Sequence, residues 1–231
     1  MMGEIKIIKK EDYDKFFQKP NQKFVWNNIA FCWKDYRNKP LEVVKDFLKN
    51  KSGLVIDFGC GSCRNMIFNK NIEYYGVDFS ENQIKNGLEY VRTKKINAHL
   101  FVSRLDKLDK NIFKNEMFDY GLFIGSLHCL ETEKERKKAL KEFFRILKKN
   151  SEALISVWNS EDKRFDKVSN KGDIYMSWKK DGKDYMRYYY LFSKKELIDL
   201  LKNVGFKILN LDFSGEDRFS RKNWIFKIKK L

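Results

Sequence analysis

The sequence predicts an α/β fold built on a mostly parallel sheet, and three observations lead to this prediction. The apolar run 54–56 leads into Asp57, Gly59 and Gly61, which is typical of a buried parallel strand that turns sharply before a helix. A second short strand ends in Asp78, and apolar strands then alternate with amphipathic helices along the chain. Turns at the carboxyl ends of such strands are where α/β sheets bind nucleotide-like ligands.

Composition restricts the class of protein. The 231 residues include 42% hydrophobic and 16% aromatic side chains, which is enough for a folded core in a single domain. The sequence has neither a membrane-spanning apolar run nor the apolar segment of a signal peptide, so we expect a cytoplasmic protein. The formal net charge of +16 favours a polyanionic partner, most simply nucleic acid; the alternative is that the lysines only solvate the surface.

The four cysteines, Cys32, Cys60, Cys63 and Cys129, predict neither disulfides nor a bound metal. Cys60 and Cys63 form a C-x-x-C pattern, which occurs in redox sites and in halves of zinc sites. No second C-x-x-C or nearby histidine completes a ligand set. We therefore interpret this pair as ordinary thiols that line the glycine turn.

The N-terminal 50 residues are expected to form a charged arm, over residues 1–20, followed by two helices within residues 24–50. Pro40 suits the first turn of the second helix. Aromatic residues of the first helix recur at spacings of three and four, so they share one face. This face either packs into the core or forms a lid that places Trp33, Tyr36 and Arg37 over a site.

The next segments place polar residues at the ends of strands. A helix is expected from about Ser62 to Asn69, and Ser80 is expected to cap the helix that follows the second strand. Strands are expected at 97–102 and 117–124, and Gly125-Ser126 leaves room above the end of the latter. His128 lies just beyond, where loops build active sites.

The second half of the chain continues the pattern with one interruption. A strong amphipathic helix is expected at 133–149 and a strand at 153–158, whereas residues 159–190 break the α/β rhythm. Aromatic and basic residues alternate there, which suits base stacking beside phosphate contacts, but equally a β-hairpin with aromatic cross-strand pairs. A helix at 194–203, stopped by Gly205, and strands at 206–213 and 223–228 complete the prediction.

Four motifs together resemble those of class I S-adenosylmethionine (SAM)-dependent methyltransferases. They are Asp57-Phe58-Gly59-Cys60-Gly61, Val77-Asp78-Phe79-Ser80, Phe118-Asp119 with Gly125-Ser126, and Arg145-Ile146-Leu147-Lys148-Lys149. The resemblance implies a Rossmann-like, seven-stranded, mostly parallel sheet with the last strand antiparallel and helices on both faces. It also implies a SAM-binding domain over 51–231 that carries a substrate-facing insertion at about 159–190.

Three further stretches resemble the tRNA wobble-uridine methyltransferases, which convert 5-carboxymethyluridine into its methyl ester. These stretches are Trp26–Ala30 with Trp33, Arg37 and Pro40; Arg187–Phe192; and Asp217-Arg218 with Asn223-Trp224. The family often works with a small zinc-binding activator protein, for which the edge strand 97–102 would offer an unpaired backbone. The implied function is SAM-dependent methylation of tRNA at a wobble uridine.

The resemblance assigns roles residue by residue. The expected cofactor-binding residues are Asp57, Gly59, Cys60, Gly61, Asp78, Phe79, Arg104, Leu105, Ile124 and Gly125. The expected catalytic residues are His128, Arg37 and Arg187, and the expected substrate-binding residues are Trp33, Tyr36, Tyr188 and Tyr189. Asp78 would accept hydrogen bonds from ribose hydroxyls, and the arginines would orient a carboxylate through fork-shaped hydrogen bonds.

The chain departs from the family pattern at two positions near the cofactor. Cys63 stands where the third glycine is usual, which we expect to be tolerated only if Cys63 is already helical. Arg104 replaces a common acid, so that a backbone carbonyl or Asp106 must accept the adenine amino group. The alternatives to a tRNA enzyme are a small-molecule O- or N-methyltransferase and a non-catalytic subunit with the same fold.

Overall fold

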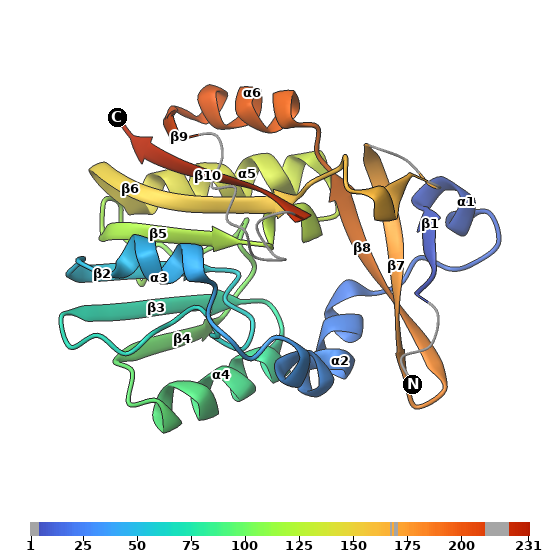
Figure 1. The fold of residues 1–231 in the computed structure, drawn as a ribbon, viewed down its shortest axis with the longest axis horizontal. Helices are drawn as coiled ribbons and strands as arrows, with labels where there is room; N and C mark the ends of the chain where they lie inside the picture. Colours follow the sequence, from blue (N-terminus) through green and yellow to red (C-terminus); the bar gives the residue numbers. More distant parts are fainter. Residues whose placement is uncertain (1–4, 167, 169–170, 211–221) are drawn as a thin grey trace.

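The computed structural model describes residues 5–166, 168, 171–210 and 222–231. Two sheets organise these residues (Figure 1). The strands, in chain order, are β1 (Ile7–Lys9), β2 (Gly53–Phe58), β3 (Ile72–Asp78), β4 (Ala98–Val102), β5 (Phe118–Ile124), β6 (Leu147–Trp158), β7 (Gly172–Lys180), β8 (Lys183–Leu191), β9 (Phe206–Asn210) and β10 (Asn223–Lys230). The helices are α1 (Lys10–Asp14), α2 (Gln22–Tyr36), α3 (Glu42–Leu48), α4 (Glu81–Thr93), α5 (Glu133–Ile146) and α6 (Lys194–Val204), with short 3₁₀ turns η1 (Leu127–Cys129) and η2 (Lys163–Phe165).

The main sheet has seven strands in the order β4-β3-β2-β5-β6-β10-β9. Strands β2 to β6 pair in parallel, whereas β10 runs antiparallel to both of its neighbours, β6 and β9. The predicted seven-stranded sheet with an antiparallel last strand is therefore confirmed. Strand β4 lies at one edge of this sheet, as expected for the segment 97–102.

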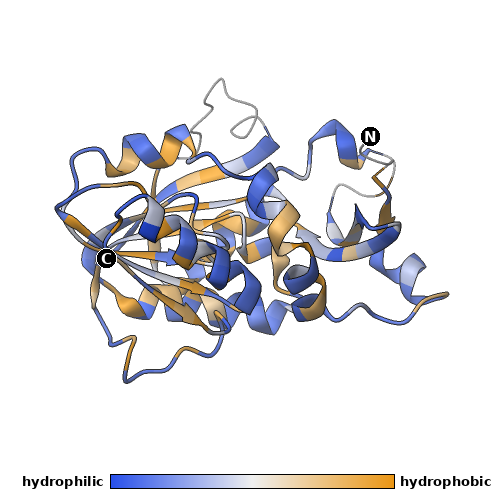
Figure 2. Cartoon of the chain, turned by 90° about the horizontal axis from the view of Figure 1, so that it is seen from below, coloured by the Kyte–Doolittle hydropathy of each residue, from blue (hydrophilic) through white to orange (hydrophobic). Residues whose placement is uncertain are grey.

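Apolar residues cover both faces of this sheet, because its central strands are buried between two layers of helices. One core cluster joins the strands to α5 and α6 through Leu140, Phe143 and Leu201. A second cluster, on the opposite face, joins them to α3 and α4 through Val44 and Ile84. In Figure 2 the helices carry both hydrophobic and hydrophilic colours, as helices with one buried and one solvated face do.

Local signals place the helix ends. Ser80 Oγ accepts a hydrogen bond from the Gln83 backbone N–H at 3.2 Å, so the predicted cap of α4 is confirmed. Thr132 and Glu135 form a reciprocal capping box at the start of α5. Gly205 ends α6 with a φ of 113°, which is the left-handed conformation that glycine adopts without strain.

Within the segment 159–190 a β-hairpin forms from Gly172 onward, so one of the two alternatives for this segment is established. Strands β7 and β8 pair antiparallel, and β1 from the N-terminal arm adds a third strand. Tyr175 and Tyr188 are buried completely in this second sheet, so the rings of these two tyrosines pack in its core. The predicted strand pair at 206–213 and 223–228 is confirmed over the described residues, whereas Asp217-Arg218 lies outside them.

Three predicted boundaries are wrong. No helix forms at 62–69: successive turns run through this segment, and Cys63 has a φ of 64°, which an α-helix excludes. The expectation that Cys63 is helical is therefore also wrong. Helix α3 begins at Glu42, beyond Pro40, and β6 already begins at Leu147, because the chain pairs with β5 from there.

Candidate functional site

A glycine turn forms the floor of the site at the carboxyl end of β2. Gly59 and Gly61 have φ values of 83° and 53°, which favour glycine. A Cβ atom on Gly59 would lie 2.3 Å from Ser126 Oγ, so the turn passes too close to the end of β5 for any side chain. Gly125, with a φ of 70°, has no heavy atom within 4 Å of its Cβ position and thus borders open space.

Asp78 ties the end of β3 to this turn. One carboxylate oxygen accepts the Gly61 N–H at 3.0 Å, and the other accepts the Ser80 N–H at 3.0 Å. Burial raises the pKa of Asp78 to about 6, against the lowering effect of these backbone donors. Since each oxygen has a second lone pair, the carboxylate can also accept hydrogen bonds from a ligand in the adjoining cavity.

Asp57 lies beneath the turn and is buried, with 2% of its surface exposed. Burial raises the pKa of Asp57 to about 7, although the charge of Arg64 acts in the opposite direction. The Asp57 side chain does not border the cavity in the part of the chain that the structure describes. Its place is under the loop, where it acts through the turn and through Arg64.

The cavity above the turn measures about 880 Å³ when the part that is open to solvent is counted. The glycine turn, the end of β5 and helix α2 surround it. Its lining includes Trp26, Trp33, Arg37, Gly59, Cys60, Gly61, Arg64, Asp78, Phe79, Gln83, Ile124, Gly125, His128, Cys129, Trp158 and Tyr189. We call this space the central pocket.

An aromatic wall closes one side of the central pocket. The rings of Trp158 and Tyr189 lie 3.8 Å apart, centroid to centroid, and the His128 ring lies 5.5 Å from Tyr189 and 5.1 Å from Trp158. His128 is completely buried, and neither of its ring nitrogens has a hydrogen-bond partner among the described residues. Burial, aided by the charge of Arg164, lowers the pKa of His128 to about 3, so the imidazole is neutral at physiological pH.

Two arginines meet in the central pocket. Arg37, at the end of α2, has its guanidinium carbon 5.5 Å from the Trp33 ring and 5.1 Å from the Tyr36 ring. Burial and the nearby charge of Arg37 lower the pKa of Arg64 to about 10, while Asp57 raises it. Both guanidinium groups line the central pocket, so an anionic group of a ligand bound there would lie near positive charge.

A second cavity continues from the central pocket past Asp78 and Phe79, and we call it the side pocket. Arg104, Leu105 and Asp106 line it, together with Gln22 and Glu135. Arg104 Nε donates to Asp106 at 2.9 Å, and a second Arg104 nitrogen donates to Glu135 at 2.5 Å. Arg104 is thus neutralised by two acids, and one of them, Asp106, is buried at the edge of the side pocket.

Most of the predicted site residues come together. The central and side pockets bring in Trp33, Arg37, Gly59, Cys60, Gly61, Asp78, Phe79, Arg104, Leu105, Ile124, Gly125, His128 and Tyr189. Tyr36 lies at an outer groove that adjoins the central pocket through Arg37. Asp57, Arg187 and Tyr188 border neither pocket within the described residues.

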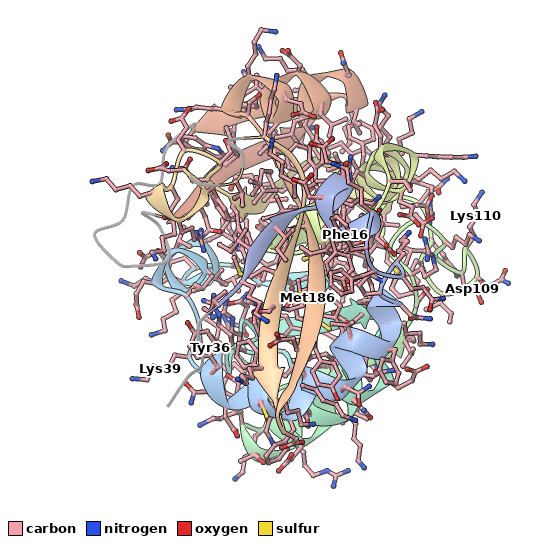
Figure 3. All side chains as sticks on the ribbon, turned by 90° about the vertical axis from the view of Figure 1, so that its right-hand side faces the viewer. Phe16, Tyr36, Lys39, Asp109, Lys110 and Met186 are labelled. Atoms are coloured by element: carbon pink, nitrogen blue, oxygen red, sulfur yellow. The ribbon has the colours of Figure 1, made fainter. Side chains whose placement is uncertain are left out.

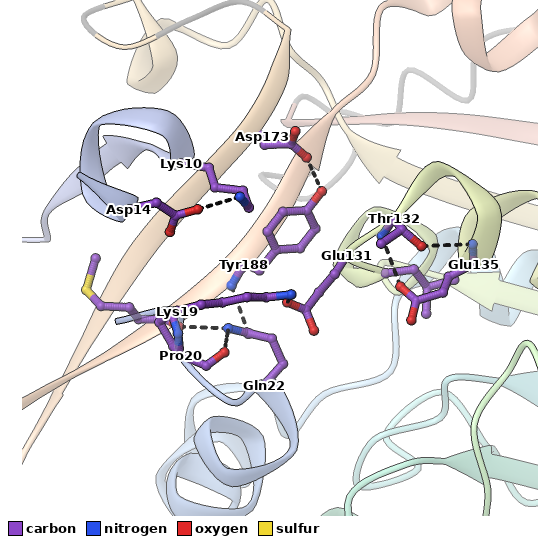
Figure 4. A network of polar contacts seen from close by, with 12 residues as sticks. Lys10, Asp14, Lys19, Pro20, Gln22, Glu131, Thr132, Glu135, Asp173 and Tyr188 are labelled. Atoms are coloured by element: carbon purple, nitrogen blue, oxygen red, sulfur yellow. Dashed lines mark hydrogen bonds and ion pairs between the residues drawn. The ribbon is translucent and has the colours of Figure 1, made fainter. Parts of the chain in front are cut away.

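Arg187 and Tyr188 support the wall from behind. Arg187 is buried, donates to the Ser177 carbonyl at 3.1 Å, and has its guanidinium carbon 5.3 Å from the Trp33 ring. The Tyr188 hydroxyl donates to Asp173 (Figure 4) and accepts from Arg136 at 3.1 Å. The Tyr188 backbone N–H donates to Gln22 at 2.9 Å, so this strand also holds the start of α2.

Three residues that line the central pocket were not predicted from the sequence. Arg64 comes soon after the glycine turn, and this position in the sequence could have predicted that it lies near the site. Trp158 is the last residue of β6, at the edge of the sheet where the other site residues lie. Gln83 Oε1 is buried and has no hydrogen-bond partner among the described residues, but a glutamine in the first turn of a helix gives no sequence signal.

The continuous space fits a nucleoside cofactor with an amino-acid tail. Gly59, Gly61 and Gly125 let such a ligand lie against the backbone, and Asp78, Leu105 and Asp106 line the adjoining space. Among the described residues, no cluster of three or more histidine, cysteine or acidic side chains suits a metal ion. No helix of the described residues is long and apolar enough to cross a membrane.

This fold and this pocket define an α/β methyltransferase that uses SAM. A family model for the methyltransferase domain matches residues 49–204, and the chain belongs to this family. Methyl transfer uses the electrophilic methyl group that the sulfonium of SAM carries. The enzyme's own task is to align the acceptor and exclude water.

Comparison with known proteins gives narrower relatives. The chain is 29% identical over 225 residues to a tRNA (carboxymethyluridine(34)-5-O)-methyltransferase of Schizosaccharomyces pombe, covering 87% of this chain and 92% of the relative. The Burkholderia thailandensis 1,6-didemethyltoxoflavin-N1-methyltransferase, solved with S-adenosylhomocysteine, has a TM-score of 0.68 at 15% identity, over 90% of this chain and 86% of that one. A putative methyltransferase solved with the Haloferax volcanii Trm112 activator has a TM-score of 0.60 at 15% identity, over 93% and 99%.

Proposed function

We propose that this enzyme methylates tRNA at a modified wobble uridine and forms the methyl ester of a 5-carboxymethyl group. The pair of arginines in the central pocket, Arg37 and Arg64, is the observation that carries the proposal, because it provides a site for an anionic acceptor. The name of the Schizosaccharomyces pombe relative and the net charge of +16 support the same substrate. A cytoplasmic location is part of this proposal.

The absence of a suitable general base favours a carboxylate acceptor. His128 is neutral but has a pKa of about 3, which makes it a poor base, and burial raises the pKa values of Cys129 and Tyr189. Among the described residues that line the pocket, Asp78 has a pKa of about 6, but its carboxylate is held by the Gly61 and Ser80 N–H groups at the cofactor side of the pocket. A carboxylate acceptor needs no general base, because it is ionised near neutral pH.

The residues then divide the task as follows. Arg37 and Arg64 hold the carboxylates of the cofactor tail and of the acceptor, and one acceptor oxygen stays free to attack. His128 and the Tyr189 hydroxyl, both buried, orient the acceptor base. Both lack hydrogen-bond partners among the described residues. Helix α2 acts as the lid, and Arg187 positions Trp33 and Tyr189 from behind.

A carboxyl methyl ester has a distinctive chemistry that allows a direct test. The enzyme is incubated with total tRNA and SAM labelled in the methyl group, and the nucleosides are separated before and after mild alkali. We expect one labelled uridine derivative whose label is lost in alkali, since esters hydrolyse and N- or C-methyl groups do not. Label in a metabolite pool instead of tRNA, or alkali-stable label, would contradict the proposal. Asp78→Ala, which removes the ribose-facing carboxylate, is the inactive control.

An activator protein is a separate part of the proposal, with β4 as its docking strand. Among the residues that the structure describes, β4 pairs on one side only, with β3, which leaves its other backbone edge open. Val102 is 48% exposed, and Leu100 and Phe101 are half-buried. An incoming strand would pair with this edge. Full tRNA activity of the purified chain alone, with no protein retained on co-purification, would argue against an activator.

A further inference from the structure

Two outer grooves give access to the pockets, and their charges differ. The first, which we call the Lys39 groove, shares Arg37, Arg64, Trp158 and Asn223 with the central pocket. The second, which we call the Lys19 groove, shares Gln22, Phe79, Arg104 and Glu131 with the side pocket. The first therefore leads to the two arginines, and the second leads to the adenine end of the cofactor site.

The cations of the Lys19 groove are neutralised. Lys19 pairs with Glu131 at 2.8 Å, as Figure 4 shows. Lys23 pairs with Glu81 at 2.5 Å, and Arg104 pairs with both Asp106 and Glu135. This groove thus offers little net attraction to a polyanion, although it contains three basic side chains.

The Lys39 groove keeps part of its positive charge, although Arg164 pairs with Asp162 at 3.2 Å. Its basic residues are Arg37, Lys39, Arg64, Arg164 and Lys222. Its acid, Glu42, already pairs with Lys45 at 2.8 Å, and within the described residues no ion pair involves Lys39 or Lys222. An excess of positive charge in a concave surface attracts phosphates and raises the local concentration of RNA.

Aromatic rings hold two of these cations in place and border the way into the pocket. The Arg164 guanidinium carbon lies 4.8 Å from the Trp158 ring and 4.7 Å from the Phe165 ring. Tyr36, which is 44% exposed, is the last residue of α2 and lies beside Arg37. Such a surface suits a single-stranded nucleic acid, because its bases can stack on the aromatic rings while its phosphates bind the cations.

We infer that the acceptor strand of the RNA enters through the Lys39 groove, with Lys39 and Lys222 binding phosphates that flank the target nucleotide. This inference rests on the proposed function for the identity of the RNA. The target base then passes Trp158 into the central pocket, while the cofactor lies along the glycine turn with its adenine end in the side pocket. The Lys19 groove is left to the cofactor.

The test compares two variants that lose the same charge at different grooves. One is Lys39→Gln with Lys222→Gln, and the other is Lys19→Gln with Lys23→Gln. The affinity for a fluorescein-labelled single-stranded RNA is measured by anisotropy at several salt concentrations, and KM for tRNA and kcat are measured in parallel. Lys110→Gln is a distant control, since Figure 3 shows Lys110 on the opposite side of the hairpin from Lys39.

We expect the Lys39/Lys222 variant to bind RNA at least tenfold more weakly, with a salt slope reduced by about 1.4, which corresponds to two lost phosphate contacts. Its kcat and its affinity for SAM should stay within twofold of wild type, and so should every value for the Lys19/Lys23 variant. Equal weakening in both double variants, or unchanged RNA binding in the first, would overturn the inference. RNA binding is measured without methyl transfer, so this inference is tested independently of the reaction. If wild type methylates tRNA but the Lys39/Lys222 variant binds RNA unchanged, only the inference about the groove is wrong. If the Lys39/Lys222 variant binds RNA more weakly but wild type forms no ester, only the proposed function is wrong.

Discussion

Cys63 Sγ lies 2.6 Å from the position that a Cβ atom on Gly87 would occupy. The turn after β2 and helix α4 thus meet at a point where neither has room for another atom. Cys63 has a positive φ, so the chain accepts a backbone conformation that costs a non-glycine residue about 1–2 kcal/mol. The Cys63 thiol offsets part of this cost because it fills the space beside Gly87 in the core.

This contact predicts a compensating pair of substitutions. Gly87→Ala should destabilise the protein by about 1–3 kcal/mol, because the new methyl group overlaps Cys63. Cys63→Gly should be close to neutral, since relief of the φ strain offsets the lost packing. The double variant should recover most of the loss, with a coupling energy above about 1 kcal/mol. Urea unfolding of all four proteins measures this, and strictly additive effects would show that the two residues do not share the space.

The same contact illustrates what sequence reasoning reaches. Asp57, the two glycines and Asp78 predicted the sheet and the cofactor edge, because strand and turn signals are local. The conformation of Cys63 was not predictable, since it depends on Gly87, a residue 24 positions further on that packs against it. Arg187 and Tyr188 were placed in the site by their motif. Whether they face the pocket or support it depends on the register of the β7–β8 hairpin.

His128 should act as a neutral orienting group. With a pKa of about 3, it stays uncharged from pH 5 upward, so kcat/KM for tRNA should show no ionisation of His128 between pH 6 and 9. His128→Phe should raise KM for tRNA at least tenfold and leave SAM affinity within twofold. His128→Gln, which keeps a donor and an acceptor, should recover part of the loss. An acidic limb near pH 6.5 that disappears in His128→Phe would instead assign a proton-transfer role.

The same substitution has a consequence for stability. The pKa of His128 is lower in the folded protein than the unfolded value of 6.5, so the unfolded chain binds the additional proton and stability falls as pH drops below 6.5. His128→Phe removes this loss. The difference in the free energy of unfolding between the variant and wild type should therefore grow by about 2 kcal/mol, in favour of the variant, on going from pH 7.5 to pH 5. Urea unfolding at the two pH values measures the difference, and an equal change in both proteins would contradict the burial of a neutral imidazole.

Tyr188 should matter for stability and for the lid, and not for the chemistry. Its buried hydroxyl links Asp173 on β7 to Arg136 on α5. Tyr188→Phe leaves both partners without this hydroxyl and should cost about 1–3 kcal/mol, while SAM affinity and kcat stay within twofold. Tyr185→Phe on the same strand is the matched control and should cost less than about 0.5 kcal/mol. A loss of kcat in Tyr188→Phe without a loss of stability would place the hydroxyl in the reaction.

Asp57 should make the ligand-free enzyme less stable as pH rises. Its folded pKa of about 7 lies above the value of 3.8 for an unperturbed aspartate, so the folded chain holds a proton that the unfolded chain has lost. Stability therefore falls between about pH 4 and pH 7, and above pH 7 the full penalty of a buried charge is present. Asp57→Asn removes the charge and keeps the shape. The variant should gain about 4 kcal/mol over wild type at pH 8 and about 2 kcal/mol at pH 5. Asp109→Asn, an exposed residue, is the control and should follow wild type at both pH values. A variant that is less stable than wild type at pH 8 would mean that the Asp57 carboxylate is ionised and well compensated, with Arg64 as the group that compensates it.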